Sequence, residues 1–269
     1  MVNTMARYTH GHHDSVLRSH RWRTVENSAA YLAPRIAPGA TLLDVGCGPG
    51  TLSVDLARRT SPGRVVGIDV DASIVDRARR DTPGNVRNVE FRTADVHEMD
   101  FDADTFDVVH AHQVLQHLDD PIAALVEMQR VCKPGGIIAV RDADYAAMTW
   151  APSDGRLERW LELYRSVAIA NGGQPDAGRF LLGWAIRAGL ANIEPSASVW
   201  CFATPKQREW WGGLWSERTR MSAFADSALA HGMASPDELA DLGEGWLDWA
   251  RSEDGWFAVL HGEIIGSVH

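Results

Sequence analysis

The sequence predicts an α/β protein with a doubly wound, parallel sheet at its centre. Between Ala40 and Val140, short apolar runs alternate with helical stretches, a rhythm typical of βαβ units. The apolar runs contain few polar residues, as expected for strands of a sheet that helices cover on both faces. Together, the alternation and the apolar strands predict the fold class.

Each element of this core is predicted from its own run of residues. Strands are expected at 41–45, 64–68, 86–93, 106–110 and 137–141, and helices at 51–59, 72–80 and 121–131. The run from Lys133 to Gly136, with sequence Lys-Pro-Gly-Gly, is expected to stop the helix at 121–131 and to turn the chain before the fifth strand.

The flanking regions have a different pattern. Residues 1–40 are polar and rich in histidine, with a helix expected at 14–32, and we interpret them as an N-terminal arm or lid. His10, His12 and His13 could belong to an arm that closes over a substrate, or to a mobile terminus.

After residue 141 the pattern becomes mainly helical. Helices are expected at 153–171, 176–188, 205–231 and 236–251, and strands at 193–204 and at 256–268, the last broken by Gly262. No Gly/Ser-rich linker separates the regions, so we expect a single domain over 1–269, with the arm at 1–40, the core at 41–141 and helical insertions within 142–269.

The charge of the chain limits its partners. The sequence of 269 residues has 26 Lys and Arg against 36 Asp and Glu, a net charge of −10. Such a surface repels phosphate backbones and anionic lipids, so we expect no nucleic-acid partner. No apolar run reaches membrane-spanning length, and the three widely spaced cysteines suit a reducing compartment. We therefore expect a cytoplasmic protein without a membrane span.

Tryptophan is unevenly distributed along the chain. Of the 11 tryptophans, only Trp22 precedes residue 150. The spacing of Trp246 and Trp249 favours one buried helix face, and core packing is the simplest role for most of the others. Trp210 and Trp211 are adjacent, so they should point in different directions, and one could line a crevice that suits an apolar or aromatic molecule.

The glycine turn after the first strand is the most informative motif. In the run from Leu42 to Thr51, glycines at 46, 48 and 50 let the backbone approach a ligand, and a helix N-terminus follows. Dinucleotide sites require G-x-G-x-x-G, but Thr51 occupies the last position. Asp69 ends the next strand, where a carboxylate can accept both hydroxyls of a ribose, and Asp95 follows the third strand.

In order and spacing, these motifs resemble those of class I S-adenosylmethionine-dependent methyltransferases. The matching runs are Asp44 to Gly50, Asp69, Asp95, Phe106 to Val109 and Lys133 to Gly136. The chain is similar to the small-molecule group that includes the ubiquinone and menaquinone biosynthesis C-methyltransferases, and the resemblance covers about residues 40 to 141. It implies a Rossmann-like sheet of seven strands, mostly parallel with an antiparallel last strand.

The resemblance also implies a cofactor site for S-adenosylmethionine, which leaves as S-adenosylhomocysteine. Asp44 would orient the methionine amino group, the turn would lie under the methionine, Asp69 would hold the ribose, and Asp95 with Val96 would meet the adenine. The full set of implied cofactor-binding residues is Asp44, Gly46, Cys47, Gly48, Gly50, Asp69, Val70, Asp95, Val96, Ala111 and His112.

Charge supports this cofactor independently of the resemblance. S-adenosylmethionine is cationic and carries no phosphate, so a turn lined by Asp44 suits it better than a nucleotide. Its methyl group is already activated, so the protein must align a nucleophile, exclude water and remove any proton. We expect in-line methyl transfer to a small apolar or aromatic acceptor (EC 2.1.1.-), without a metal.

Several alternatives stay open from the sequence. The fold could keep the cofactor and catalyse another step, such as a cyclisation. A nicotinamide oxidoreductase is disfavoured by Thr51, and a protein acceptor and a homodimer are left open.

Four residues are candidates for a catalytic base: His112, His117, Asp144 and Tyr145. The alternatives are cofactor-flanking or packing roles for the histidines, and solvated loop positions for Asp144 and Tyr145. His110, His112 and His117 could suggest a metal set, but His110 and His112 alternate along a strand end and no H-E-x-x-H pattern accompanies them.

Overall fold

The structure is a computed structural model that describes Thr9 and residues 14–269. His10, His12 and His13 lie outside the described residues. The strands are β1 (Thr41–Val45), β2 (Arg64–Asp69), β3 (Val89–Thr93), β4 (Phe106–His112), β5 (Cys132–Ala143), β6 (Thr149–Ala151), β7 (Ala191–Phe202) and β8 (Trp256–Ser267). They form one sheet in which β3, β2, β1, β4, β5, β8 and β6 are neighbours in that order, and β7 pairs with β8.

The sheet is mostly parallel with an antiparallel last strand, as expected. The first five strands pair parallel to one another. β8 runs antiparallel to β5, β6 and β7. The expected count of seven strands misses β6, because three residues give too short a run to be recognised in the sequence.

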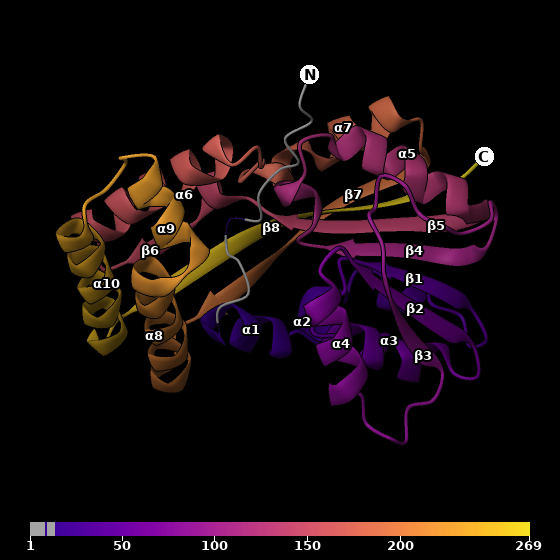
Figure 1. Cartoon of the computed structure of the whole chain (residues 1–269), viewed down its shortest axis with the longest axis horizontal. Coiled ribbons are helices and arrows are strands. Elements are labelled where there is room, and N and C mark those ends of the chain that lie inside the picture. Colours follow the sequence, from indigo (N-terminus) through magenta and orange to yellow (C-terminus); the bar gives the residue numbers. More distant parts are fainter. Residues whose placement is uncertain (1–8, 10–13) are drawn as a thin grey trace.

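The helices are α1 (Asp14–Arg21), α2 (Val25–Ser28), α3 (Thr51–Thr60), α4 (Ala72–Asp81), α5 (Pro121–Val131), α6 (Gly155–Ala170), α7 (Leu181–Ala188), α8 (Pro205–Met221), α9 (Ala223–Ala230) and α10 (Pro236–Arg251). Short 3₁₀ turns are η1 (Ala33–Arg35), η2 (Leu115–His117), η3 (Tyr145–Ala147) and η4 (Ala177–Phe180). Helices α2, α3 and α4 lie on one face of the sheet, and α5 and α7 lie on the other (Figure 1). The buried side chains of each group pack against the strands on that face.

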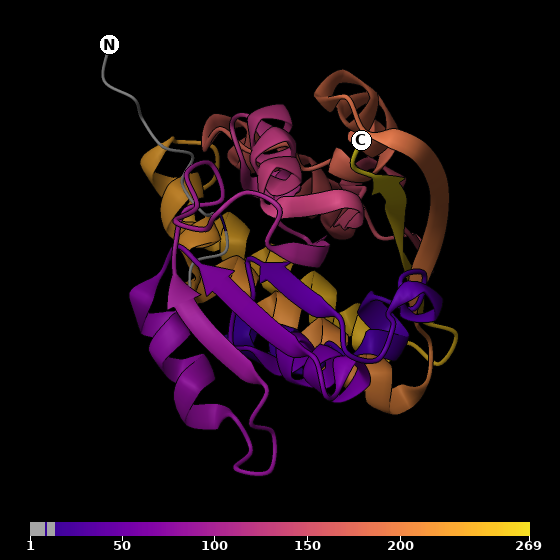
Figure 2. The same cartoon turned by 90° about the vertical axis from the view of Figure 1, so that its right-hand side faces the viewer.

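The remaining helices form a separate aromatic core. Side chains from α6, α8, α9 and α10 pack together around the ends of β7 and β8, and these helices gather at one end of the molecule (Figure 1). In Figure 2 the strands β1 to β4 stand in front of them. The buried tryptophans of this aromatic core are Trp160, Trp200, Trp211, Trp215, Trp246 and Trp249.

Several predicted boundaries are wrong, for local reasons. The expected helix at 14–32 is interrupted, because Thr24 starts a new helix with a capping box to Asn27. The expected helix at 205–231 is two helices, because Ser222 caps the second. The third strand starts at Val89, and the segment 176–188 begins as a 3₁₀ turn.

Two glycine predictions also need correction. Gly262 does not break β8, which is continuous through it. A Cβ at Gly262 would lie 2.0 Å from the Gly178 carbonyl oxygen, so glycine lets η4 cross the strand closely. The run from Lys133 to Gly136 belongs to β5, where a register shift opposite Phe106 accommodates it.

Candidate functional site

A crevice lies at the carboxyl ends of β1 and β4, as expected for an open parallel sheet. The glycine turn forms one wall, and the arm, from the end of α1 to Arg23, contributes the other. The lining residues are His20, Arg23, Asp44, Gly46, Cys47, Pro49, Thr51, Leu52 and His112. The arm residues His20 and Arg23 were not predicted as site residues.

The turn keeps its shape only with glycine. Gly46, Gly48 and Gly50 have φ values of 64°, 54° and 80°, in the left-handed region that side chains avoid. A Cβ at Gly46 would lie 2.4 Å from a methyl of Val114. The Cys47 thiol stays protonated, because burial and then the charges of Asp69 and Asp44 raise its pKa well above the usual value.

Asp44 places a buried carboxylate in the crevice. Its Oδ1 lies 2.9 Å from Nδ1 of His110, its neighbour across β1 and β4, and its Oδ2 accepts a hydrogen bond from Ser53 on α3. Two contacts therefore fix the carboxylate, and each oxygen keeps a lone pair for a cationic group. His110 serves Asp44, a role that the sequence interpretation missed.

Asp69 joins the end of β2 to the glycine turn. Its Oδ2 accepts the Gly48 amide at 3.0 Å, and its Oδ1 accepts the Asp71 amide at 3.1 Å. Val70 beside it is 65% exposed, and neither residue is among those that line the crevice.

Asp95 and Val96 follow β3, and neither is among the residues that line the crevice. Asp95 accepts hydrogen bonds from the backbone of His97 at 2.9 Å and lies 3.0 Å from its ring Nδ1. Val96 is buried in the core.

The two residues that end β4 differ in their surroundings. Ala111 is buried in the core on one face of the sheet. His112 lines the crevice, and its ring nitrogens have no hydrogen-bond partner within residues 14–269. Burial, followed by the charges of Arg23 and Arg141, lowers the pKa of His112 well below its usual value, so the ring is neutral.

A second, aromatic cavity lies beside the crevice. Its lining residues are Ser19, His20, Trp22, Arg23, Gln113, Gln116, His117, Ala143, Tyr145, Met148, Trp200, Trp211, Trp215, Arg218 and Val259. Its volume of about 20 Å³ leaves room for about one water molecule, so the cavity is closed in this conformation. His20 and Arg23 line both spaces, which places the crevice and the aromatic cavity next to each other.

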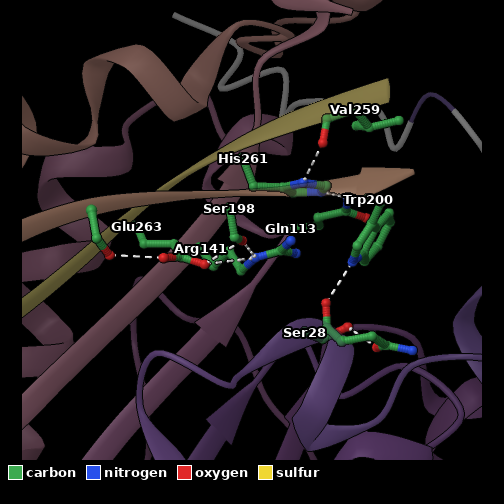
Figure 3. Close-up of polar contacts among 10 residues, drawn as sticks. Ser28, Gln113, Arg141, Ser198, Trp200, Val259, His261 and Glu263 are labelled. Atoms are coloured by element: carbon green, nitrogen blue, oxygen red, sulfur yellow. Dashed lines mark hydrogen bonds and ion pairs between the residues drawn. The ribbon is translucent and has the colours of Figure 1, made fainter. Parts of the chain in front are cut away.

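The arm is tied to the sheet by a chain of polar contacts. Arg23 donates to Oε1 of Gln113, whose Nε2 lies 2.9 Å from His261 Nε2. The other His261 nitrogen contacts the Val259 carbonyl, and the Trp200 indole donates to the backbone of α2 (Figure 3). Gln113, whose φ is 55°, links the arm to β8 through these side-chain contacts.

The four candidate bases are in different environments. His117 and Tyr145 line the aromatic cavity, and His112 lines the crevice. Asp144 lines neither, because Arg179 binds both of its oxygens at 2.7 and 2.8 Å. The alternative of solvated loop positions is also wrong, since Asp144 and Tyr145 are both buried.

The remaining candidates differ in protonation. Burial raises the pKa of Tyr145, whose ring stacks on Tyr164 with centroids 4.2 Å apart. Burial and the charge of Arg23 lower the pKa of His117 to about 3, so this imidazole is neutral.

The tryptophan predictions are correct in part. Trp246 and Trp249 are both buried on one face of α10, as their spacing predicted. Trp211 lines the aromatic cavity, but both it and Trp210 lie against Phe202, with ring centroids 4.1 and 6.0 Å away. The expectation that the two rings serve different faces is therefore wrong.

Among the described residues, no group of three His, Cys, Asp or Glu side chains is placed to hold a metal ion. In the same part of the chain, no helix combines the length and the apolar character needed to cross a membrane.

The buried histidines predict acid sensitivity. The pKa values of His112, His117 and His261 are lowered mainly by burial, so the unfolded chain binds their protons more readily as the pH falls below about 6.5. Asp142 acts in the opposite direction, because burial raises its pKa to about 7 and the folded chain gains its proton first. With three such groups against one, stability should fall between pH 6.5 and 5, by roughly 1.4 kcal/mol per pH unit for each net proton.

Urea unfolding at pH 7.5, 6.5 and 5.5 checks this prediction. Replacing His261 with Gln should make the free energy of unfolding depend less steeply on pH, by the equivalent of about one proton. A free energy of unfolding that stays constant from pH 7 to 5 would contradict it.

Comparison with known proteins agrees with the geometry. The methyltransferase-domain family matches residues 36–220. An uncharacterized methyltransferase of Schizosaccharomyces pombe is 34% identical, with 96% of this chain and 95% of that protein aligned. A ubiquinone biosynthesis O-methyltransferase of Hahella chejuensis is 38% identical over 36% of this chain and 41% of its own length.

A solved structure shares the fold. The phosphoethanolamine N-methyltransferase 2 of Haemonchus contortus, in complex with phosphomonomethylethanolamine and S-adenosylhomocysteine, superposes with a TM-score of 0.53 at 19% identity. The match covers 89% of this chain and 52% of that one.

Proposed function

Because the chain belongs to the methyltransferase-domain family and is a class I S-adenosylmethionine-dependent methyltransferase, we propose that it methylates a small aromatic acceptor held in the aromatic cavity. The observation that carries this proposal is the shared wall of the two spaces, formed by His20 and Arg23. A donor in the crevice and an acceptor in the cavity would then be neighbours, as in-line transfer requires.

The residues of the crevice suit S-adenosylmethionine by their charge. Asp44 would attract the cationic amino group, and Arg23, which also lines the crevice, would attract the carboxylate on the same α-carbon of the methionine. The glycine turn would let the backbone approach, and Asp69 would accept the ribose hydroxyls. Val70, Asp95 and Val96 would surround the adenine.

The protein's own task is to orient and enclose the reactants. When bound, the cofactor supplies a methyl group already activated by its sulfonium. The rings of Trp22 and Trp200 lie against each other, with centroids 5.1 Å apart. In this position the arm separates the cavity from bulk water.

We also propose a cytoplasmic location. Cys47, Cys132 and Cys201 are free thiols, which suits a reducing compartment.

Methyl transfer tests the proposal directly. The protein is incubated with methyl-labelled S-adenosylmethionine and a whole-cell extract separated into small-molecule and protein fractions. We expect label in a small aromatic metabolite. Label confined to the protein fraction would contradict the acceptor class, and cofactor binding without any transfer would favour another reaction, such as a cyclisation.

A further inference from the structure

Gln116 places an unused hydrogen-bond acceptor in the wall of the aromatic cavity. It lies in η2 and is only 3% exposed. Its Nε2 is 3.0 Å from His117 Nε2, but its Oε1 has no hydrogen-bond partner in the described part of the chain. Folded proteins seldom leave a buried carbonyl oxygen unpaired, so this atom calls for a ligand or a water molecule.

The backbone around Gln116 is fixed from two sides. Its N–H donates to Asp142 Oδ1 at 3.2 Å, and its carbonyl accepts the Gln174 amide at 2.7 Å. The chain also passes closely at Gly173, where a Cβ would lie 2.9 Å from the Gln116 carbonyl oxygen. The side chain therefore starts from a rigid point, which favours selective recognition.

The contact between the Gln116 amide nitrogen and His117 implies the tautomer of the neutral ring. With its pKa at about 3, the His117 ring carries one proton near neutral pH. We assign this proton to Nδ1, so that Nε2 accepts a hydrogen bond from the Gln116 amide nitrogen. The carbonyl oxygen is then the free end of the amide.

The other polar side chains of the wall include two pairs that bind each other, since Arg23 donates to Gln113 and Arg218 donates to Ser19. Much of the remaining wall is flat and apolar. Trp200, Trp211 and Trp215 line the cavity with Tyr145 and Met148. Rings of this kind stack well on a planar molecule but offer it few hydrogen-bond donors or acceptors. A polar contact from Gln116 would then decide which planar molecules bind.

We propose that Gln116 selects the methyl acceptor, by accepting through Oε1 a hydrogen bond from a hydroxyl or N–H group on an aromatic ring. The inference rests on the proposed function, because it places the acceptor in the aromatic cavity. An aromatic molecule without a donor would leave the carbonyl unpaired and would bind more weakly.

Phenol and anisole provide a matched pair of probes, since methylation removes the donor from the same ring. Each is titrated by ligand-observed NMR into the full chain saturated with S-adenosylhomocysteine. The wild type should bind phenol about tenfold more tightly than anisole. Gln116→Met keeps the side-chain length without the amide, so it should bind the two equally, chiefly by losing affinity for phenol.

Gln129→Leu is the matched control, because its amide bonds carbonyls of α5 and α7 and does not line the cavity. It should keep the preference for phenol. S-adenosylhomocysteine titration of each variant shows that the fold is intact, and Gln116→Leu serves as a second variant.

Two kinds of result would overturn the inference. The first is a wild type that binds both probes equally, or neither. The second is a Gln116 variant that retains the preference. Normal S-adenosylhomocysteine binding together with either result would leave the cofactor site standing, whereas absent binding to the wild type would overturn the proposed function as well.

Discussion

Replacing Glu263 with Ala should destabilise the protein by about 3–5 kcal/mol, because it leaves a buried cation without its counter-charge. Arg141 Nε donates to Glu263 Oε1 at 3.1 Å, and the two side chains are only 2% and 5% exposed (Figure 3). The same carboxylate accepts hydrogen bonds from Ser196 and Ser198. Burial already lowers the pKa of Arg141 to about 10, which shows how poorly its charge is solvated.

Urea unfolding measures this loss, with Glu194→Ala as the matched control. Glu194 lies on β7 and pairs with Arg35, but both side chains are about half exposed, at 59% and 48%. Its loss should change the free energy of unfolding by less than about 1 kcal/mol. Equal losses of unfolding free energy in the two variants would contradict the prediction, because the buried ion pair would then contribute no more than the exposed one.

Replacing Asp69 with Ala should weaken S-adenosylhomocysteine binding by at least about 100-fold, the second large effect. A carboxylate that accepts two ribose hydroxyls makes two charge-assisted hydrogen bonds, each contributing about 1.5–3 kcal/mol. Asp69 also holds the Gly48 amide of the turn, so its removal loosens the wall of the crevice. Isothermal titration calorimetry measures the change.

Two variants separate these contributions. Asp69→Asn keeps an oxygen acceptor without the charge and should lose less affinity than Asp69→Ala. Asp76→Ala removes an exposed carboxylate of α4 that pairs with Arg79, and it should bind like the wild type. Unchanged affinity in Asp69→Ala would place the ribose elsewhere.

The core of the fold could be predicted because its signals are local. An apolar strand such as 41–45, and a turn with three glycines in the left-handed region, can each be recognised from a few consecutive residues. The positions of Asp44 and Asp69 follow from the strands that carry them, since parallel strands end at one edge of the sheet. The apolar runs of the two strands were therefore enough to place both carboxylates at the same edge of the sheet.

The aromatic cavity could not be predicted, because distant segments build it. The aromatic cavity brings together the arm, η2 and α8, which are far apart in the chain. Arg179 pairs with Asp144 from 35 residues away, so no local pattern indicates that this candidate base already has a partner. Likewise, the role of Gly262 depends on η4 crossing it.

A calorimetric titration of the wild type with S-adenosylhomocysteine, in parallel with NAD⁺, tests the cofactor site most directly. Asp44 in the lining of the crevice, and Thr51 in place of the last glycine of the dinucleotide pattern, predict saturable one-to-one binding of S-adenosylhomocysteine and no binding of NAD⁺. Binding of NAD⁺ alone, or of neither ligand, would contradict the account.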